Sequence, residues 1–303
     1  MDFEKPIYHD SSEDFFLKLF RNKPESKLKK EINKILTNSS DWPIQYHLSP
    51  QRTILLECFN FGKNKSILEI GAGCGAITKL FTKKFKIVHA LELEAKRAEI
   101  IKLRLKDKTN LKIIQSDLLN FKTKRKYDYI TLIGVLEYAG SFFGNSFLKD
   151  KYSYKPFISM IKKAKSFLKP NGQLIIAIEN KLGIRYLSGC TEDHYDILNE
   201  SLEDYPDYNG TRTFSKNELK KILNMAGFEK KPKFYYPFPD YKFPKIILNK
   251  KYLYKISTAE IFPSPDYAKK RYFNINEILL AQTLKKAKIL SQFSNSFLIF
   301  ISN

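Results

Sequence analysis

The chain has 303 residues and is 43% hydrophobic, enough apolar material for one large globular domain or two smaller ones. Its formal net charge is +21, and such an excess is typical of proteins that bind nucleic acid or anionic membranes. Only 8 of the 53 basic residues are arginine, the side chain best suited to specific phosphate recognition. We therefore interpret the charge as a lysine-rich solvated surface and do not expect nucleic acid as the partner.

The cysteines and the apolar runs indicate the compartment. Cys58, Cys74 and Cys190 have no metal-binding spacing and cannot all pair, so we expect neither a disulfide framework nor a bound metal. No apolar run approaches the roughly 18 residues that span a membrane. The N-terminus lacks the basic and apolar regions of a signal peptide. These features predict a cytoplasmic protein.

The first fifty residues are predicted to form a helical extension. Residues 12–37 have the apolar spacing of amphipathic helices. Residues 42–50 are interpreted as an irregular connector, and residues 51–59 predict a further helix. We therefore divide the chain into an N-terminal helical extension, residues 1–50, and a second domain, residues 51–303.

The most informative motif is SILEIGAGCG at residues 66–75, where an apolar run ends in three glycines on alternate positions. A helical stretch follows, and then a second apolar run ends on Glu92. Strand, glycine turn, helix, strand and acid form the first half of a nucleotide-binding α/β unit. The glycines allow the backbone to approach a ligand closely. Glu92 stands where a carboxylate can accept hydrogen bonds from ribose hydroxyls.

The rest of the chain continues the alternation and then interrupts it. Short strands are predicted before Asp117, before Gly134 and over residues 173–178. Residues 181–211 are too long for an ordinary loop and are predicted to be a lid or an acceptor-binding segment. The later elements are a helix at 214–226 with Ser215 as N-cap, a strand at 234–236, a second excursion at 237–274, a helix at 275–290 and a strand at 296–301.

The glycine motif resembles that of the class I S-adenosylmethionine-dependent methyltransferases. In the dinucleotide fingerprint G-x-G-x-x-G, Ala76 would occupy the last position, so a nicotinamide-binding Rossmann domain is the weaker alternative. The resemblance implies a Rossmann-like α/β sheet, mostly parallel, with a final antiparallel strand, and S-adenosylmethionine as cofactor. It assigns these residues to cofactor binding: Glu69, Gly71, Gly73, Gly75, Glu92, Asp117, Leu118 and Gly134.

Further stretches resemble a subgroup of these enzymes associated with bacterial cell-surface polysaccharide gene clusters. They are YHLSP at 46–50, IGVLEY at 133–138, AIENKLG at 177–183, EDH at 192–194 and YPFPDY at 236–241. The resemblance implies O-methylation of a sugar or another small-molecule or glycan acceptor. A hydroxyl acceptor benefits from a general base. We predict His194, beside Asp193, as that base, with His47 second.

Two alternatives stay open. The first is an RNA methyltransferase, because the glycine motif is also similar to that of the rRNA adenine dimethyltransferases. Those enzymes carry an Asn-x-Pro-Tyr type motif after the fourth strand, whereas this chain has Gly134-Val135-Leu136-Glu137 there. The second is a non-catalytic, cofactor-binding scaffold. The sequence specifies neither the acceptor, nor the oligomeric state, nor the role of residues 1–41.

Overall fold

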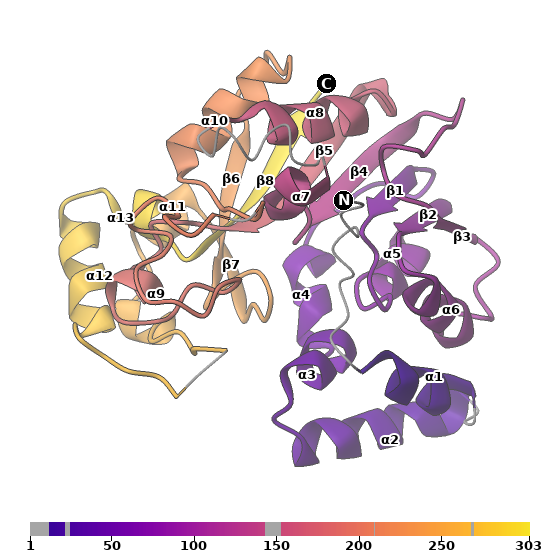
Figure 1. Cartoon of the computed structure of the whole chain (residues 1–303), viewed down its shortest axis with the longest axis horizontal. Coiled ribbons are helices and arrows are strands. Elements are labelled where there is room, and N and C mark those ends of the chain that lie inside the picture. Colours follow the sequence, from indigo (N-terminus) through magenta and orange to yellow (C-terminus); the bar gives the residue numbers. More distant parts are fainter. Residues whose placement is uncertain (1–11, 22–24, 143–152, 209, 268–269) are drawn as a thin grey trace.

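The computed structural model describes residues 12–21, 25–142, 153–208, 210–267 and 270–303. These residues form one 8-stranded sheet with the order β3-β2-β1-β4-β5-β8-β6-β7 (Figure 1). The strands are β1 Ser66–Ile70, β2 Ile87–Glu92, β3 Leu111–Gln115, β4 Tyr127–Ile133, β5 Leu168–Glu179, β6 Lys233–Phe238, β7 Ile246–Asn249 and β8 Ser296–Ser302.

The sheet confirms the predicted Rossmann-like methyltransferase arrangement. Strands β3, β2, β1, β4 and β5 are parallel to one another. Strand β8 is antiparallel to both β5 and β6, as predicted for the final strand. Strand β7 was not predicted; it lies inside the second excursion and pairs antiparallel with β6 at the edge of the sheet.

Helices cover both faces of the sheet, which explains why its central strands are apolar without alternation. On one face, Leu68, Leu132 and Ile176 pack with helices α8 and α10. On the other face, Ile67 and Ile175 pack with α4 and α5. The longer helices are α1 Glu13–Arg21, α2 Glu25–Asn38, α3 Trp42–Leu48, α4 Gln51–Glu57, α5 Thr78–Lys84, α6 Ala95–Arg104, α8 Lys155–Lys165, α10 Lys216–Met225 and α12 Glu277–Lys286. The short ones are η1 Leu136–Tyr138, α7 Ala139–Phe142, α9 Ile184–Leu187, α11 Lys250–Leu253, η2 Thr258–Glu260 and α13 Leu290–Phe293.

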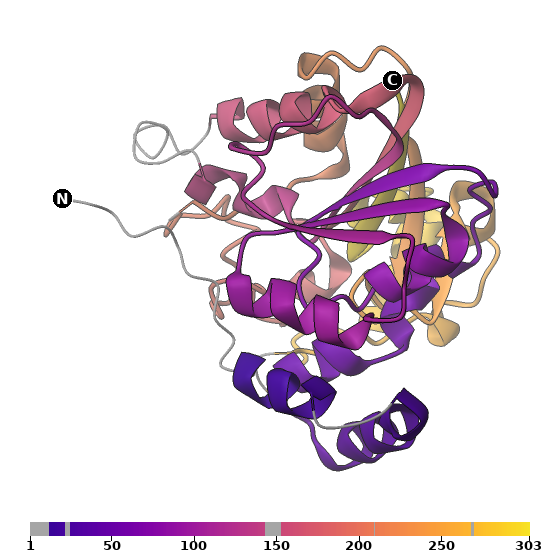
Figure 2. The ribbon, with the colours of Figure 1, turned by 90° about the vertical axis from the view of Figure 1, so that its right-hand side faces the viewer.

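Helix α1 lies against α6, and α2 lies against α3 (Figure 2). Arg97 Nε of α6 lies 3.0 Å from Glu13 Oε1 of α1, and both side chains are buried. The predicted connector at 42–50 is wrong, because residues Trp42–Leu48 form α3. Pro43 occupies the first turn of α3, where a missing N–H costs nothing. The division of the chain at residue 50 stays a prediction.

Two predicted boundaries differ from the structure. The helix at 214–226 is confirmed as α10, and Ser215 and Glu218 form the predicted capping box. The helix predicted at 275–290 divides into α12 and α13, because Lys288 adopts a positive φ of 60° between them. The fifth strand begins five residues earlier than predicted, at Leu168, which pairs with Tyr127 of β4.

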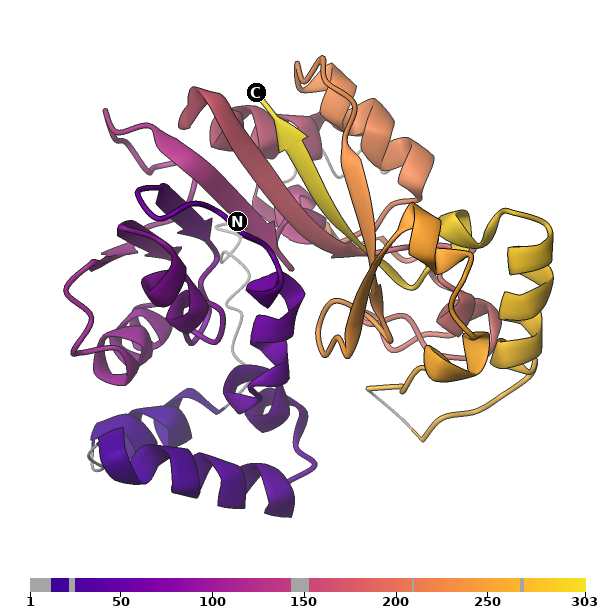
Figure 3. The ribbon, with the colours of Figure 1, turned by 180° about the vertical axis from the view of Figure 1, so that it is seen from behind.

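The two excursions, predicted separately, pack against each other. Arg185 of the first excursion lies 3.5 Å from Asp240 of the second, measured from Nη1 to Oδ2, and Lys242 Nζ lies 2.8 Å from Asp193 Oδ2. In Figure 3, which views the molecule from behind, the orange and yellow C-terminal segments lie on the opposite side of the molecule from the indigo N-terminal helices. Among the described residues, no helix is long and apolar enough to cross a membrane.

Candidate functional site

A cleft of about 640 Å³ opens at the carboxyl ends of the parallel strands. Its floor is formed by the residues that follow β1, β2, β4 and β5. One wall comes from α3 and the other from the two excursions. Its lining includes Trp42, Tyr46, His47, Glu69, Gly71, Gly73, Glu92, Asp117, Leu118, Gly134, Glu137, Tyr138, Glu179, Asp193, His194, Tyr241, Lys242 and Tyr267.

The glycine loop is fixed by backbone contacts to the second strand. Gly71 and Ala72 donate their N–H groups to Leu91 O at 2.9 and 3.2 Å. Gly71 has a φ of +72°, and a Cβ added there would lie 2.5 Å from Val135 Cγ2. Only glycine fits this position, because the loop passes directly over the segment that follows β4.

Glu92 connects the end of β2 to the same loop. Its Oε2 accepts a hydrogen bond from the Gly73 N–H at 2.6 Å, and its Oε1 accepts one from the Glu94 N–H at 3.0 Å. Burial raises the pKa of this carboxyl group, and the two backbone donors oppose the rise. The carboxylate is thus held in place at the edge of the cleft, where the prediction placed a ribose.

Glu69 lies beneath the loop at the end of β1. Thr78 Oγ1 donates a hydrogen bond to Glu69 Oε2 at 2.6 Å. Burial raises the pKa of Glu69 to about 8, so a substantial part of this group is protonated at neutral pH. A protonated carboxyl group can donate as well as accept, which suits a polar cofactor group above it.

The remaining predicted cofactor residues divide into two groups. Asp117, Leu118 and Gly134 line the cleft, and Asp117 also accepts hydrogen bonds from the Asn120 backbone and side chain. Gly75 lies apart from the lining, with the site of its missing Cβ 3.3 Å from Ile101 of α6. Its positive φ of 76° indicates that it shapes the turn.

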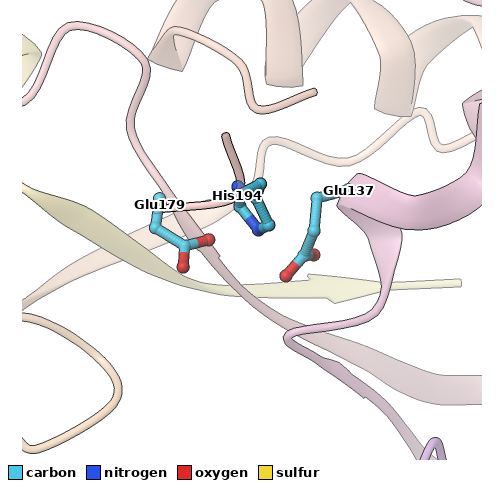
Figure 4. Close-up of side chains that lie close together, drawn as sticks. All are labelled: Glu137, Glu179 and His194. Carbon is cyan, nitrogen blue, oxygen red and sulfur yellow. The ribbon is translucent and has the colours of Figure 1, made fainter. Parts of the chain in front are cut away.

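On the acceptor side, Glu137, Glu179 and His194 point toward one another from three different elements (Figure 4). Glu137 comes from η1, Glu179 from the end of β5 and His194 from the first excursion. Each offers a ligand atom within 4.8 Å of the others. The two carboxylates and the imidazole can form hydrogen bonds with the molecule that receives the methyl group, take up its proton, or bind a cation.

The partner of His194 is Glu192, which the sequence did not single out. His194 Nδ1 lies 2.8 Å from Glu192 Oε1, and the His194 N–H donates to Glu192 Oε2 at 2.6 Å. Burial would lower the pKa of His194, but Glu192, Glu179 and Glu137 raise it to about 9. The pair of a buried carboxylate and an imidazole is the arrangement of an oriented acid–base group.

Asp193 is occupied by ion pairs and does not orient His194. Arg185 Nη2 lies 3.0 Å from Asp193 Oδ1, and Lys242 Nζ lies 2.8 Å from Oδ2. Although burial opposes ionisation, Arg185 and Lys242 hold the pKa of Asp193 well below its usual range. Asp193 therefore joins the two excursions at the cleft, and its catalytic role stays a prediction.

His47 lies on the opposite wall. It is buried, its ring packs edge-on against Phe16 and Tyr46, and its Cε1 lies 3.6 Å from the site of a Gly73 Cβ. It therefore lies beside the glycine loop, apart from the acid cluster. Tyr241 and Lys242 were not predicted as site residues, although Tyr241 ends the YPFPDY stretch that carries part of the resemblance.

Comparison with known proteins gives two kinds of match. The family model of ribosomal RNA adenine dimethylase matches residues 47–159. Ribosomal RNA small subunit methyltransferase A of Mycoplasma mycoides is 26% identical over 192 residues, which is 61% of this chain and 59% of the relative. The protein of the same name from Syntrophus aciditrophicus is 34% identical over 80 residues, 26% of each chain.

A solved structure shows the same fold. A chain from the complex between the Haloferax volcanii Trm112 methyltransferase activator and a methyltransferase superposes with a TM-score of 0.50 at 12% identity. The superposition covers 90% of this chain and 97% of that one.

Fold and matches agree on an S-adenosylmethionine-dependent methyltransferase, which confirms the predicted enzyme class and cofactor. They do not support the polysaccharide subgroup, and they favour the RNA alternative over the predicted sugar acceptor. The chain spans 59% of the length of the Mycoplasma mycoides relative, so that protein's acceptor is not carried over with the match.

Proposed function

We propose that this chain transfers the methyl group of S-adenosylmethionine to RNA. The observation that carries the proposal is the match to ribosomal RNA adenine dimethylase over residues 47–159. That stretch includes the glycine loop, Glu92, Asp117 and the segment after β4, which line the part of the cleft where we propose that the cofactor binds. The expectation that nucleic acid is not the partner is revised accordingly.

The acceptor side of the cleft has the composition that a single nucleotide requires. The aromatic side chains of Trp42, Tyr46, Tyr138, Tyr241 and Tyr267 line it together with buried carboxylates. Enzymes that modify nucleotides take them out of the stack and hold them between aromatic rings in such a pocket. Methyl transfer then needs mainly the acceptor atom held at attack distance from the methyl carbon.

A lysine-lined cavity supports the same proposal. It lies between α11, η2 and the end of α12, and its lining holds Lys250, Lys285, Lys286 and Lys288 without an acidic side chain. Thr258, whose Oγ1 is buried without a hydrogen-bond partner among the described residues, belongs to the same lining. Lys285 Nζ donates to the Ile256 backbone oxygen, so Lys250, Lys286 and Lys288 are the ammonium groups that we expect to meet phosphate groups of a polynucleotide.

The match gives less support for the adenine amino group as the methylated atom than for RNA as the substrate. Gly134-Val135-Leu136-Glu137 stands where the rRNA adenine dimethyltransferases carry an Asn-x-Pro-Tyr type motif. The match therefore does not identify the methylated atom.

The test is transfer of label from methyl-labelled S-adenosylmethionine to total cellular RNA, followed by digestion with ribonuclease or protease. We expect label that ribonuclease releases, that falls steeply as salt is raised, and that is lost in Glu92→Ala. Label that survives ribonuclease, or no label in RNA while S-adenosylmethionine binds, would overturn the RNA proposal.

A second candidate is O-methylation of a small molecule or glycan. The observation that favours it over methylation of a nucleobase amino group is the buried Glu192–His194 pair, because a hydroxyl acceptor depends more on an acid–base group. With a pKa of about 9, His194 would accept a proton only in the minor, neutral form that it has at pH 7. The same labelled reaction with nucleotide sugars and glycan fractions distinguishes the two candidates, since only one acceptor fraction should carry label.

A further inference from the structure

We propose that Glu137, Glu179 and His194 bind a divalent metal ion at the acceptor end of the cleft. The three ligand atoms lie within 4.8 Å of one another (Figure 4). Metal–ligand bonds of about 2.0–2.5 Å place two ligands of one ion roughly 3–5 Å apart. This spacing allows all three atoms to bind one ion at the centre of the cluster.

Both carboxylates keep an oxygen without a partner. Glu137 and Glu179 are each 1% exposed, and their Oε2 atoms have no hydrogen-bond partner among the described residues. Leaving a buried carboxylate oxygen unsatisfied is costly. A metal ion at the centre of the cluster would satisfy both oxygens at once.

The surroundings orient the ligands as metal sites require. Glu192 holds Nδ1 of His194, which leaves Nε2 for a metal and reproduces the carboxylate–histidine–metal arrangement. Lys242 Nζ lies 2.6 Å from Glu179 Oε1, and the Tyr241 hydroxyl donates to the same oxygen at 3.2 Å. These contacts fix the Glu179 carboxylate and leave Oε2 directed elsewhere.

The local charge also calls for a cation. The buried acids in contact around the cluster outnumber the cations that pair with them. The cations of this group are Arg185, Lys242 and the protonated form of His194. The acids are Glu137, Glu179, Glu192, Asp193 and Asp240. A divalent ion would offset most of the remaining negative charge.

The ion would select the acceptor atom, and this part of the inference rests on the proposed function. A hydroxyl oxygen bound to the metal ionises more readily, as metal-bound water does. Its proton would pass to Oε1 of Glu137, the carboxylate oxygen that does not bind the metal, and the hydroxyl oxygen would attack the methyl carbon. The carbon–sulfur bond breaks with its electron pair going to sulfur, which leaves neutral S-adenosylhomocysteine. In RNA the acceptor would be a ribose 2′-hydroxyl.

Binding of Mn²⁺ alone, measured by electron paramagnetic resonance on the full chain without acceptor, tests the site independently of activity. We expect one bound ion in the wild type and at least about ten-fold weaker binding in Glu137→Gln, Glu179→Gln and His194→Gln. Glu200→Gln is the matched control, because Glu200 is a buried acid of the same excursion outside the cluster. Circular dichroism checks that each variant folds.

The outcomes separate the two proposals. Wild-type protein that binds no Mn²⁺ at millimolar concentration, or folded cluster variants that bind it like the wild type, would overturn the metal site. Mn²⁺ binding without methylation of RNA would leave the site standing and overturn the RNA proposal. A product methylated on a base, with the ion bound, would overturn the assignment of a hydroxyl acceptor.

Discussion

Glu92 accepts a hydrogen bond from the backbone N–H of Gly73 at 2.6 Å, although the two residues are 19 positions apart. The bond fixes the end of β2 to the middle of the glycine loop. The residue expected to bind ribose therefore also shapes the loop expected to surround the methionine part of the cofactor. Cofactor affinity and loop geometry depend on the same carboxylate.

Replacing Glu92 should abolish cofactor binding. In Glu92→Ala the Gly73 N–H loses its acceptor and the ribose loses its partner, so we expect at least about a hundred-fold weaker binding of S-adenosylmethionine, since hydrogen bonds to charged groups contribute about 1.5–3 kcal/mol each. Isothermal titration calorimetry measures the change. Glu99→Gln, an exposed acid on α6, should bind like the wild type. Unchanged affinity in Glu92→Ala would show that the ribose lies elsewhere.

Two glycines with positive φ should differ sharply when replaced. Gly62→Ala should cost about 1–2 kcal/mol of unfolding free energy for the backbone conformation alone, because only the flexible Lys65 side chain lies near. Gly71→Ala adds a clash with Val135, and should cost more and abolish cofactor binding. Denaturant unfolding measures both. Equal losses would mean that the loop can move away from Val135.

The acceptor side should influence turnover rather than cofactor affinity. We expect His194→Gln to lower kcat by about 10²–10⁴-fold while the Kd for S-adenosylmethionine stays within two-fold, because the side chain lies in the acid cluster. Single-turnover kinetics and calorimetry give the two quantities. A parallel loss of cofactor affinity would indicate that His194 supports the cofactor cradle.

Asp128 should make stability depend on pH in acid. It accepts hydrogen bonds from Ser66 N–H and Oγ–H at 2.9 and 2.8 Å, and it pairs with Lys169 Nζ at 2.8 Å. Burial would raise the pKa of Asp128, but these partners lower it. Its contribution is therefore complete above the unfolded pKa of about 3.9 and is lost as pH falls below it.

The comparison of wild type with Asp128→Asn tests this expectation. At pH 7 the variant should be about 1–3 kcal/mol less stable, and the difference should shrink below about pH 4. Urea unfolding at several pH values gives the difference. A constant difference across that range would contradict the assigned ionisation.

Removal of the Arg185 charge should destabilise the packing of the two excursions. In Arg185→Met, Asp193 and Asp240 lose their buried partner, so we expect a loss of about 3–5 kcal/mol. Thermal unfolding measures it. Arg125→Met, at an exposed position, is the control and should unfold like the wild type.

The first half of the fold could be predicted because its signals are local. The glycine loop, the strand ends at Glu92 and Asp117, and the Ser215 capping box each follow from a few neighbouring residues. Strand β7 could not be predicted, because Ile246–Asn249 is short and becomes a strand only by pairing with β6. Helix α3 was predicted as part of an irregular connector, although Pro43 lies in its first turn, where a helix tolerates proline.

Most residues predicted to bind the cofactor lie together along one cleft, and their role there stays a prediction, whereas the contacts of the predicted base could not be predicted. His194 could be selected as a histidine in a long polar segment, but its partner could not. Glu192, two residues away, bonds to it, whereas the adjacent Asp193 points to Arg185 and Lys242. Which of two neighbouring acids faces a side chain depends on tertiary contacts, and the sequence alone carries no signal for it.

The spread of the site along the chain has a consequence for folding. Glu69, Gly73, Glu92 and Asp117 lie within a short stretch, whereas the acid cluster joins residues 137, 179 and 194 and depends on the second excursion. Closing the longer loops costs more chain entropy, and segments joined by few contacts open first. Under mild denaturant, hydrogen exchange should therefore show the two excursions opening before the stretch from Glu69 to Asp117. The protein would then retain S-adenosylmethionine after it has lost its acceptor.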